Sequence, residues 1–286
     1  MSRRPQAIIL LTHARAHDTR GALMRVLELA REAGMEVHVP PSEAAKHELQ
    51  AGDGLVVDDD PEGKAELALV LGGDGTILST LRRYTGTRVP VFAINFGTIG
   101  FLATVEPWEL EQGVRHALAG DFDVMELPAL VAQTADGEAV AINDMSFHRR
   151  QNGRVAELAY SVTGEELGEV RCDGLVVSTP AGSTGYNLAN GGPVLAWGVE
   201  GFVVSFIAPH TLTARSLVVA PGDLLEVRNR SRHEDVDMTT DGQIVCPLAP
   251  EATMAIRFEK GRSLLAQAPG ATFYHRLRDK FGRLSY

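Results

Sequence analysis

A single aspartate lies inside a glycine-rich turn in the first third of the chain. Residues 72–76 read GGDGT, and the aspartate of this run is Asp74. Glycines let the backbone approach a ligand closely, and the amides of a turn that leads into a helix attract phosphate oxygens. A carboxylate beside phosphate oxygens is electrostatically unfavourable, so its presence there indicates that it acts on a hydroxyl group or a metal ion. Asp74 therefore has the character of a residue that orients and deprotonates a hydroxyl in phosphoryl transfer.

This turn differs from two familiar phosphate-binding loops. No Gly-Lys-Ser/Thr follows it, as a P-loop requires, and Leu78 stands where the dinucleotide fingerprint has its third glycine. An ordinary strand–helix turn in which Asp74 caps the helix would use the same residues without catalysis. From this turn alone, both interpretations remain open.

A second glycine-rich turn follows the next apolar run, where residues 95–102 read NFGTIGFL. Neighbouring strands of a parallel sheet end at a shared edge, so we expect this turn to face residues 72–76. Phe101 would then stack on a base, or it would belong to the core.

The longest run of small and hydroxyl-bearing residues is DGLVVSTPAGSTGYN at 173–187. The hydroxyls of Ser183 and Thr184 and the flat ring of Tyr186 suit a ligand that contains a sugar and a base. The run is not the nucleophile elbow of a serine hydrolase, because Ala181 occupies the place of the first required glycine. The alternative is a glycine-rich connection between strands.

Other polar residues of the second half have two interpretations each. Asn143 and Asp144 either hold ribose hydroxyls or form an Asx turn. A local group of arginines either neutralises a pyrophosphate or is solvated surface. These arginines are Arg149, Arg150, Arg154 and Arg171.

The elements that position these motifs change character along the chain. Apolar runs separated by helical segments predict a parallel sheet in an α/β domain, with strands at 7–11, 36–39, 67–71 and 89–94. Asp18 or Thr19 is expected to cap the first helix, and residues 51–64 are expected to form a loop. The basic tail at 271–281 is expected to be helical and to pack on this first domain.

After about residue 121, short alternating segments separated by turn residues predict an antiparallel β domain. The expected strands are 130–134, 140–149, 155–162, 174–178, 202–207, 217–219, 224–228, 244–246 and 254–258.

Composition narrows the class of protein further. A net charge of −10 over 286 residues argues against a nucleic-acid binder, which needs clustered Lys and Arg. No stretch approaches a membrane span and no secretory signal is recognisable, so we expect a cytoplasmic protein. Cys172 and Cys246 stand apart without metal-ligand spacing, which predicts reduced buried thiols and no protein-bound metal site.

Together the motifs resemble those of the NAD kinases, in the same order and over nearly the whole chain. GGDG by itself also occurs in related forms in phosphofructokinases and lipid kinases, whereas the run DGLVVSTPAGSTGYNLANGGP is specific. The matching motifs are 72–76, 95–102, Asn143 with Asp144, 173–193, and Asp241 with Gly242 and Gln243.

The resemblance implies a kinase that transfers a phosphoryl group from ATP to the 2′-hydroxyl of the adenosine ribose of NAD, making NADP. It implies an α/β domain at 1–122, a β-rich NAD-binding domain at 123–267, and a last helix within 268–286 that returns to the first domain. Asp74 would be the catalytic base. The donor phosphates, with Mg²⁺ or another divalent cation, would lie on Gly72, Gly73, Gly75 and Thr76.

The resemblance also implies an NAD site. Asn143 and Asp144 would contact hydroxyls or the base, and Asp173 would face the nicotinamide end with Arg171 and Arg154 nearby. The remaining residues assigned to binding are Asn95, Phe101, Ala181, Ser183, Thr184, Gly185, Tyr186, Asn187, Ala189 and Gln243.

Three positions depart from the family pattern: Asp144 replaces glutamate, Ala181 replaces threonine, and Gly185 replaces alanine. The sequence leaves open whether ATP or polyphosphate is the donor, whether NADH is accepted, and whether NADP(H) regulates the enzyme. The family forms homodimers and homotetramers, which implies the same here. The glycine turn alone also fits a lipid or sugar kinase, and the dinucleotide motifs also fit a sensor without turnover.

Overall fold

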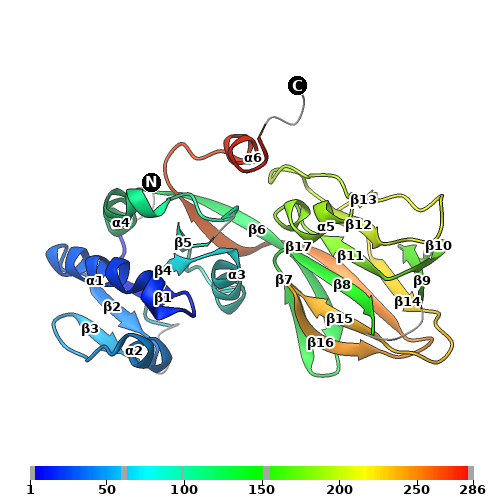
Figure 1. Cartoon of the computed structure of the whole chain (residues 1–286), viewed down its shortest axis with the longest axis horizontal. Coiled ribbons are helices and arrows are strands. Elements are labelled where there is room, and N and C mark those ends of the chain that lie inside the picture. Colours follow the sequence, from blue (N-terminus) through cyan, green and yellow to red (C-terminus); the bar gives the residue numbers. More distant parts are fainter. Residues whose placement is uncertain (1–3, 59–62, 98–99, 151–154, 283–286) are drawn as a thin grey trace. The chain divides into compact units, whose positions relative to one another are not determined.

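A computed structural model describes residues 4–58, 63–97, 100–150 and 155–282 (Figure 1). The chain divides into two compact units. Unit 1 comprises Met1–Glu126 and Ser263–Tyr286, and unit 2 comprises Leu127–Arg262. The strands β6 (Asp123–Thr134) and β17 (Thr253–Gln267) contribute residues to both units.

Unit 1 is built on a parallel sheet with the strand order β5-β4-β1-β2-β3. The C-terminal end of β17 adds to it in parallel, since Leu265 pairs with Val91 of β5. The residues of β4 are all buried, which explains the continuous apolar run in the sequence. The strands are β1 (Ala7–Thr12), β2 (Glu36–Val39), β3 (Leu55–Val57), β4 (Leu67–Gly72) and β5 (Val91–Asn95).

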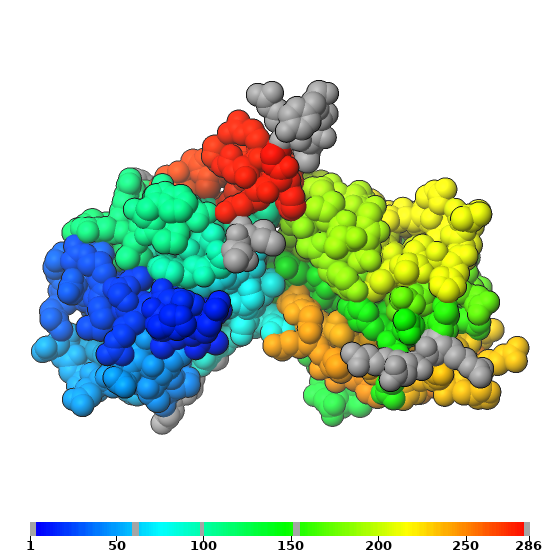
Figure 2. All heavy atoms as spheres, in the orientation of Figure 1, coloured from blue at the N-terminus to red at the C-terminus, as the bar shows by residue number. Residues whose placement is uncertain are grey.

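Helices cover the parallel sheet of unit 1. Leu23 and Val26 of α1 and Val114 of α4 are buried in one apolar cluster with Leu10 of β1 and Leu69 of β4. The side of α1 that is not buried forms part of the surface drawn in dark blue in Figure 2. The helical segments are α1 (Ala16–Glu32), α2 (Pro41–His47), α3 (Asp74–Arg83), η1 (Pro107–Glu109), α4 (Leu110–Ala119) and α6 (Phe273–Phe281).

Unit 2 is formed by antiparallel β-structure. One sheet has the order β13-β12-β11-β8-β15-β16. The other runs β10-β9-β14-β17, with β6 paired to β17 and β7 paired to β6. The bounds are β7 (Gly137–Ala141), β8 (Asp144–Arg149), β9 (Ala156–Val162), β10 (Glu165–Cys172), β11 (Gly174–Ser178), β12 (Phe202–Ile207), β13 (Leu217–Val219), β14 (Leu225–Asn229), β15 (Val236–Thr240) and β16 (Gln243–Leu248). A short 3₁₀ turn, η2 (Gly182–Thr184), precedes α5 (Tyr186–Ala189).

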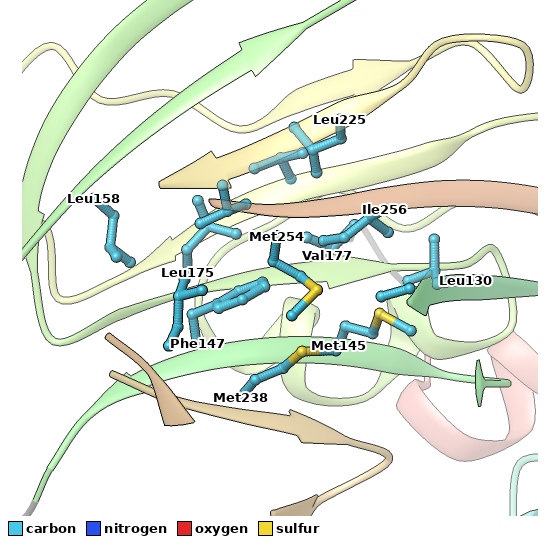
Figure 3. Packing of buried hydrophobic residues seen from close by; sticks show 14 of the residues in the cluster. Leu130, Met145, Phe147, Leu158, Leu175, Val177, Leu225, Met238, Met254 and Ile256 are labelled. Atoms are coloured by element: carbon cyan, nitrogen blue, oxygen red, sulfur yellow. The ribbon is translucent and has the colours of Figure 1, made fainter. Parts of the chain in front are cut away.

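The core of unit 2 lies between its two sheets. Figure 3 shows Phe147 of β8 and Leu175 of β11 pointing toward Met254 of β17, with Leu225 of β14 close by. Alternate residues of each strand supply these side chains, as expected for sheets that are buried on one face. Cys172 belongs to this core, and burial raises the pKa of its thiol to about 12.

The sequence predicted the class of each unit but missed several elements. The expected loop at 51–64 contains β3, and the expected strand at 140–149 is divided between β7 and β8. The helices α2 and α4 and the strands β10 and β15 were not expected. Strand β10 is hard to recognise because it lies at the end of its sheet and is mostly polar and exposed.

The expected cap of the first helix was also wrong. Helix α1 begins at Ala16 with Arg15 at the N-cap position, so Asp18 lies in the first turn and Thr19 is buried. No helix in the described part of the chain is long and apolar enough to cross a membrane.

Candidate functional site

Asp74 is the first residue of α3, and Gly73 occupies the N-cap position. The carboxylate of Asp74 does not cap its own helix. Its Oδ2 accepts the main-chain N–H of Phe101 at 2.9 Å, and its Oδ1 accepts that of Leu102 at 3.1 Å. The interpretation of Asp74 as a helix cap is therefore wrong, because its side chain holds a different segment of the chain.

The two glycine-rich turns of unit 1 lie against each other. A Cβ atom added at Gly97 would come within 2.7 Å of the Cα atom of Gly73, which only glycine at both positions permits. The N–H of Phe96 donates to the carbonyl oxygen of Gly72 at 3.1 Å. This contact confirms the prediction that the turns face each other at the carboxyl ends of β4 and β5.

Asn95 shapes the second turn from within. It is buried, its Oδ1 accepts the N–H of Gly97 at 3.0 Å, and its Nδ2 donates to Glu106 at 3.1 Å. Gly100 has a φ of +57°, and a Cβ atom there would collide with the Asn95 side chain. The polar atoms of Asn95 thus serve the turn itself.

The sequence left open whether Phe101 stacks on a base or belongs to the core. Its side chain is 5% exposed, and its ring lies 5.9 Å from those of Phe273 and Phe281 of α6. The ring thus packs against the last helix of unit 1, while the N–H of the same residue holds Asp74.

A cleft of about 1060 Å³ opens beside the two turns in unit 1. One side is formed by glycine backbone, including Gly73, Gly75 and Gly97, and Thr76 at the start of α3 also lines it. Trp108 lines the cleft too and is 80% exposed. Exposed amides at a helix start beside a flat aromatic ring suit a ligand with phosphates and a base.

No motif in the sequence indicated the polar cluster on another side of this cleft, which is lined there by Thr12, His13 and Lys46. The Nζ of Lys46 on α2 donates to the main-chain oxygens of Thr12 and His13 and, at 2.7 Å, to Glu43. The Thr12 hydroxyl in turn contacts Glu43 at 2.8 Å and the Nε2 of His47 at 2.7 Å. The cluster fastens α2 to the end of β1, and burial lowers the pKa of His47.

In unit 2, Asp241 organises the segment that carries Asn143 and Asp144. Its carboxylate accepts the main-chain N–H groups of Ile142 at 3.1 Å, Asn143 at 2.7 Å and Asp144 at 3.2 Å. Asp241 has a φ of +46°, a left-handed conformation that aspartate tolerates better than most residues. From the sequence, Asp241 was expected only as part of the matching motif at 241–243, without a role of its own.

The glycine-rich run at 173–187 folds directly over this segment. The N–H of Thr179 donates to the carbonyl oxygen of Asn143 at 2.9 Å, and the Thr179 hydroxyl donates to that of Ile142 at 2.7 Å. A Cβ atom at Gly182 would overlap the Asn143 carbonyl. The structure therefore brings together two motifs that are separated in the sequence.

Two residues of this run are engaged inside the loop. Ser183 and Asn187 are fully buried. The Ser183 hydroxyl donates to the carbonyl oxygen of Pro180 at 2.8 Å and accepts the N–H of Leu195 at 2.9 Å. The Nδ2 of Asn187 donates to the carbonyl oxygens of Ser183 and Pro193. These side chains hold the loop in shape, and Ala181 beside them is also buried.

Other members of the predicted site are accessible from solvent. The ring of Tyr186 is stacked on that of His148, with centroids 5.6 Å apart, and the side chain is 37% exposed. Burial raises the pKa of Tyr186, and the charge of Asp144 contributes to the same shift. Gly185, Ala189 and Gln243 are also exposed, and the Thr184 hydroxyl donates to the carbonyl oxygen of Ala181 at 3.2 Å.

The arginines that were expected to form a positive group are paired with carboxylates where the structure describes them. Arg149 contacts Asp173 at 2.6 Å, and Arg171 contacts Glu157 at 3.3 Å. Arg150 contacts Asp235 at 3.0 Å and Asp237 at 2.9 Å. Arg154 lies outside the described residues.

Comparisons with known proteins match the N-terminal and C-terminal parts of the chain to two separate domain families. The ATP-NAD kinase N-terminal domain matches residues 8–122, and the ATP-NAD kinase C-terminal domain matches residues 142–265. The chain is 33% identical to an NAD kinase of Geobacter sulfurreducens over 276 residues, covering 93% of this chain and 95% of that protein. It is 36% identical to an NAD kinase of Gemmatimonas aurantiaca over 220 residues, covering 75% of this chain and 76% of that protein.

Two solved structures have a similar fold. Yeast NADH kinase complexed with NADH superimposes with a TM-score of 0.86 at 22% identity, covering 98% of this chain and 89% of that one. An NAD kinase from Archaeoglobus fulgidus in complex with ATP superimposes with a TM-score of 0.73 at 25% identity, covering 96% of this chain and 97% of that one.

Proposed function

The chain belongs to the NAD kinase family, and on this basis we propose that Asp74 is the base that activates the 2′-hydroxyl of the adenosine ribose of NAD. The enzyme is a kinase that uses ATP to convert NAD to NADP. The hydroxyl proton passes to the carboxylate, the freed oxygen bonds to the terminal phosphorus of ATP, and the bond from that phosphorus to ADP breaks.

The observation that carries the role of Asp74 is its fixed carboxylate at the start of α3. Its two oxygens accept the N–H groups of Phe101 and Leu102, and each carboxylate oxygen has a further lone pair for a substrate hydroxyl. The carboxylate is attached to the glycine turn that borders the cleft. Phosphoryl transfer is catalysed mainly by positioning the reacting groups and stabilising charge, and a base held in one orientation contributes to the positioning.

We place the ATP phosphates in the cleft of unit 1, against the amides of Gly73, Gly75 and Thr76. The Archaeoglobus fulgidus relative binds ATP, which supports ATP rather than polyphosphate as the donor. We place Mg²⁺ with the donor phosphates in this cleft, as the family resemblance implies. The described residues contain no group of three or more His, Cys, Asp or Glu that could hold a metal ion. When bound, Mg²⁺ would neutralise charge on the transferred phosphoryl group.

We assign the NAD contacts to unit 2, at Asn143, at the buried Asp144, and at the exposed side chains of Tyr186 and Gln243. The hydroxyl-bearing loop, the neighbouring carboxyl of Asp144 and the flat ring of Tyr186 suit a dinucleotide with two riboses. Ser183 and Asn187 were expected to bind NAD, but their buried side chains support the loop from inside, so we assign them an indirect contribution to binding. Asp173 and Arg171 retain their assignment near the nicotinamide end as part of this proposal.

The reaction can be tested by incubating the purified protein with NAD, ATP and Mg²⁺ and measuring NADP. Asp74→Asn is expected to lower kcat at least ~10²-fold while NAD still binds, because the amide cannot accept the proton. Asp121→Asn is the matched control, since Asp121 is an exposed aspartate of unit 1 that does not line the cleft. An unchanged kcat in Asp74→Asn would remove Asp74 from catalysis, whereas no NADP from the wild-type protein would contradict the reaction itself.

The same assay addresses the finer points. NADH in place of NAD tests the acceptor, and polyphosphate in place of ATP tests the donor. We also propose that the protein is cytoplasmic and forms a homodimer or homotetramer, as the family resemblance implies. Light scattering on the purified protein measures its oligomeric state directly.

A further inference from the structure

Arg276 is a buried arginine on α6, the last helix of unit 1. Its side chain is only 7% exposed. Its Nη1 donates to the main-chain oxygen of Phe101 at 2.7 Å and to that of Leu102 at 3.2 Å. Burying a guanidinium is costly unless hydrogen bonds and opposite charge compensate, so such a residue calls for an explanation.

The two residues that Arg276 holds are the two that hold Asp74. Their carbonyl oxygens accept from the guanidinium, and their N–H groups donate to the carboxylate at 2.9 and 3.1 Å. Residues 101 and 102 therefore form a peptide bridge between a positive and a negative group. A cation at the carbonyl end of a hydrogen-bonded chain polarises it and strengthens the bonds that its N–H groups make.

Electrostatics and packing both link α6 to this bridge. Burial lowers the pKa of Arg276 to about 10, and the charge of Asp74 opposes that shift, so the two groups act on each other in the folded protein. The rings of Phe273 and Phe281, near the two ends of α6, pack against the ring of Phe101. The helix thus contacts both the side chain and the main chain of the bridge.

We propose that Arg276 is a positioning residue for catalysis, which acts through residues 101 and 102 to hold the Asp74 carboxylate in the orientation that accepts the ribose proton. This inference rests on the proposed role of Asp74 as the base. It gives the C-terminal helix a direct part in the geometry of the active site, in addition to its contribution to the stability of unit 1.

The first test compares three variants of the full chain by NADP formation. Arg276→Ala is expected to lower kcat by ~10- to 100-fold and to leave KM for NAD and ATP within about threefold, because misorientation of a general base slows the chemical step. Arg276→Lys is expected to have an intermediate kcat, since lysine keeps the positive charge but lacks the planar guanidinium group. Arg278→Ala is the control, because Arg278 is an exposed arginine on the same helix that contacts His275 and Asp279.

The second test asks whether the loss passes through Asp74. In the Asp74→Asn background, Arg276→Ala is expected to have little further effect on kcat, because the group that it positions is already absent. Faster amide hydrogen exchange at Phe101 and Leu102 in Arg276→Ala, with unchanged protection in β1 and β4, is the expected structural readout. Should Arg276→Ala fail to fold, Arg276→Lys carries the same cycle and the same exchange measurement.

Three results would overturn the inference: wild-type kcat in a folded Arg276→Ala protein, an equal fold-loss in the Asp74→Asn background, or an equal loss in Arg278→Ala. Failure of the proposed function looks different. Wild-type protein that makes no NADP would contradict the reaction, and a fully active Asp74→Asn protein would contradict the base.

Discussion

The carboxylate of Asp241 accepts the main-chain N–H of Asp144 at 3.2 Å, so two acidic residues are held together in unit 2. Burial, with a contribution from the negative charge of Asp241, raises the pKa of the Asp144 carboxyl to about 7. Near neutral pH, Asp144 is therefore present in two forms, a protonated carboxyl that can donate a hydrogen bond and a charged carboxylate that only accepts. The ratio of the two forms affects both the stability of the protein and the binding of any ligand that contacts Asp144.

Asp144 should make the free protein less stable as the pH rises. Its pKa in the folded state is above the value of 3.8 for an ordinary aspartate, so the folded protein binds the proton more tightly than the unfolded one does. The stabilisation is present below about pH 4 and is lost by about pH 7, with an upper limit of ~4 kcal/mol. Denaturant unfolding of wild-type and Asp144→Asn protein at pH 5 and pH 8 measures this.

Asparagine mimics the protonated carboxyl, so the variant should gain stability over wild type between pH 5 and pH 8. His47 contributes in the opposite direction, because burial lowers its pKa and the stability it provides is lost as the pH falls. That contribution is present in both proteins and cancels in the comparison. The same difference between the two proteins at both pH values would refute a raised pKa for Asp144.

Gly182→Ala should disrupt the loop within residues 173–187, whereas Gly185→Ala should be tolerated. A Cβ atom at Gly182 would overlap the carbonyl group of Asn143, while the nearest atom to a Cβ at Gly185 is 3.4 Å away. We expect Gly182→Ala to lower the free energy of unfolding by ~1–3 kcal/mol and to abolish detectable NAD binding. Thermal unfolding and calorimetric NAD titration of both variants test this, and equal behaviour would contradict it.

Gly97→Ala should separate the two turns of unit 1. The added Cβ atom would lie 2.7 Å from the Cα atom of Gly73, which is backbone and cannot rotate away. Destabilisation of ~1–3 kcal/mol and a lower kcat are expected, because Gly73 directly precedes Asp74. The control is Gly75→Ala, where nothing lies within 4 Å of the new atom and alanine favours the helix. Unfolding curves that show Gly97→Ala as stable as Gly75→Ala would rule out this close contact.

Trp108 should report on the donor nucleotide. It is exposed beside the cleft, and the chain contains one other tryptophan, Trp197. We expect MgATP to change the tryptophan fluorescence and tripolyphosphate, which has no base, to leave it unchanged. The response should vanish in Trp108→Phe and persist in Trp197→Phe.

In Trp108→Ala the KM for ATP should rise up to roughly tenfold, the equivalent of one aromatic stacking contact. An unaltered KM, or an equal fluorescence response to tripolyphosphate, would mean that the base does not stack on this ring.

The order and class of the elements near the glycine turn were predictable because their signals are local. An apolar run, a glycine turn and a helical period each reflect the conformational preferences of adjacent residues. The contact between Gly73 and Gly97 was predictable for a related reason, since neighbouring parallel strands must end at one edge. Strands β10 and β15 were not predictable, because their polar residues do not reveal that the strands belong to a sheet.

The sequence by itself determined the family, the glycine turn with Asp74, and the motif at 173–187, since each is a run of residue types at fixed spacing. Only the tertiary structure decided what each side chain does. It showed Ser183 and Asn187 turned inward, Asp241 holding the segment of Asp144, and Arg276 bound to the residues that hold Asp74. Such partners are remote in the chain, and only the packing of the folded units brings their atoms within hydrogen-bonding distance.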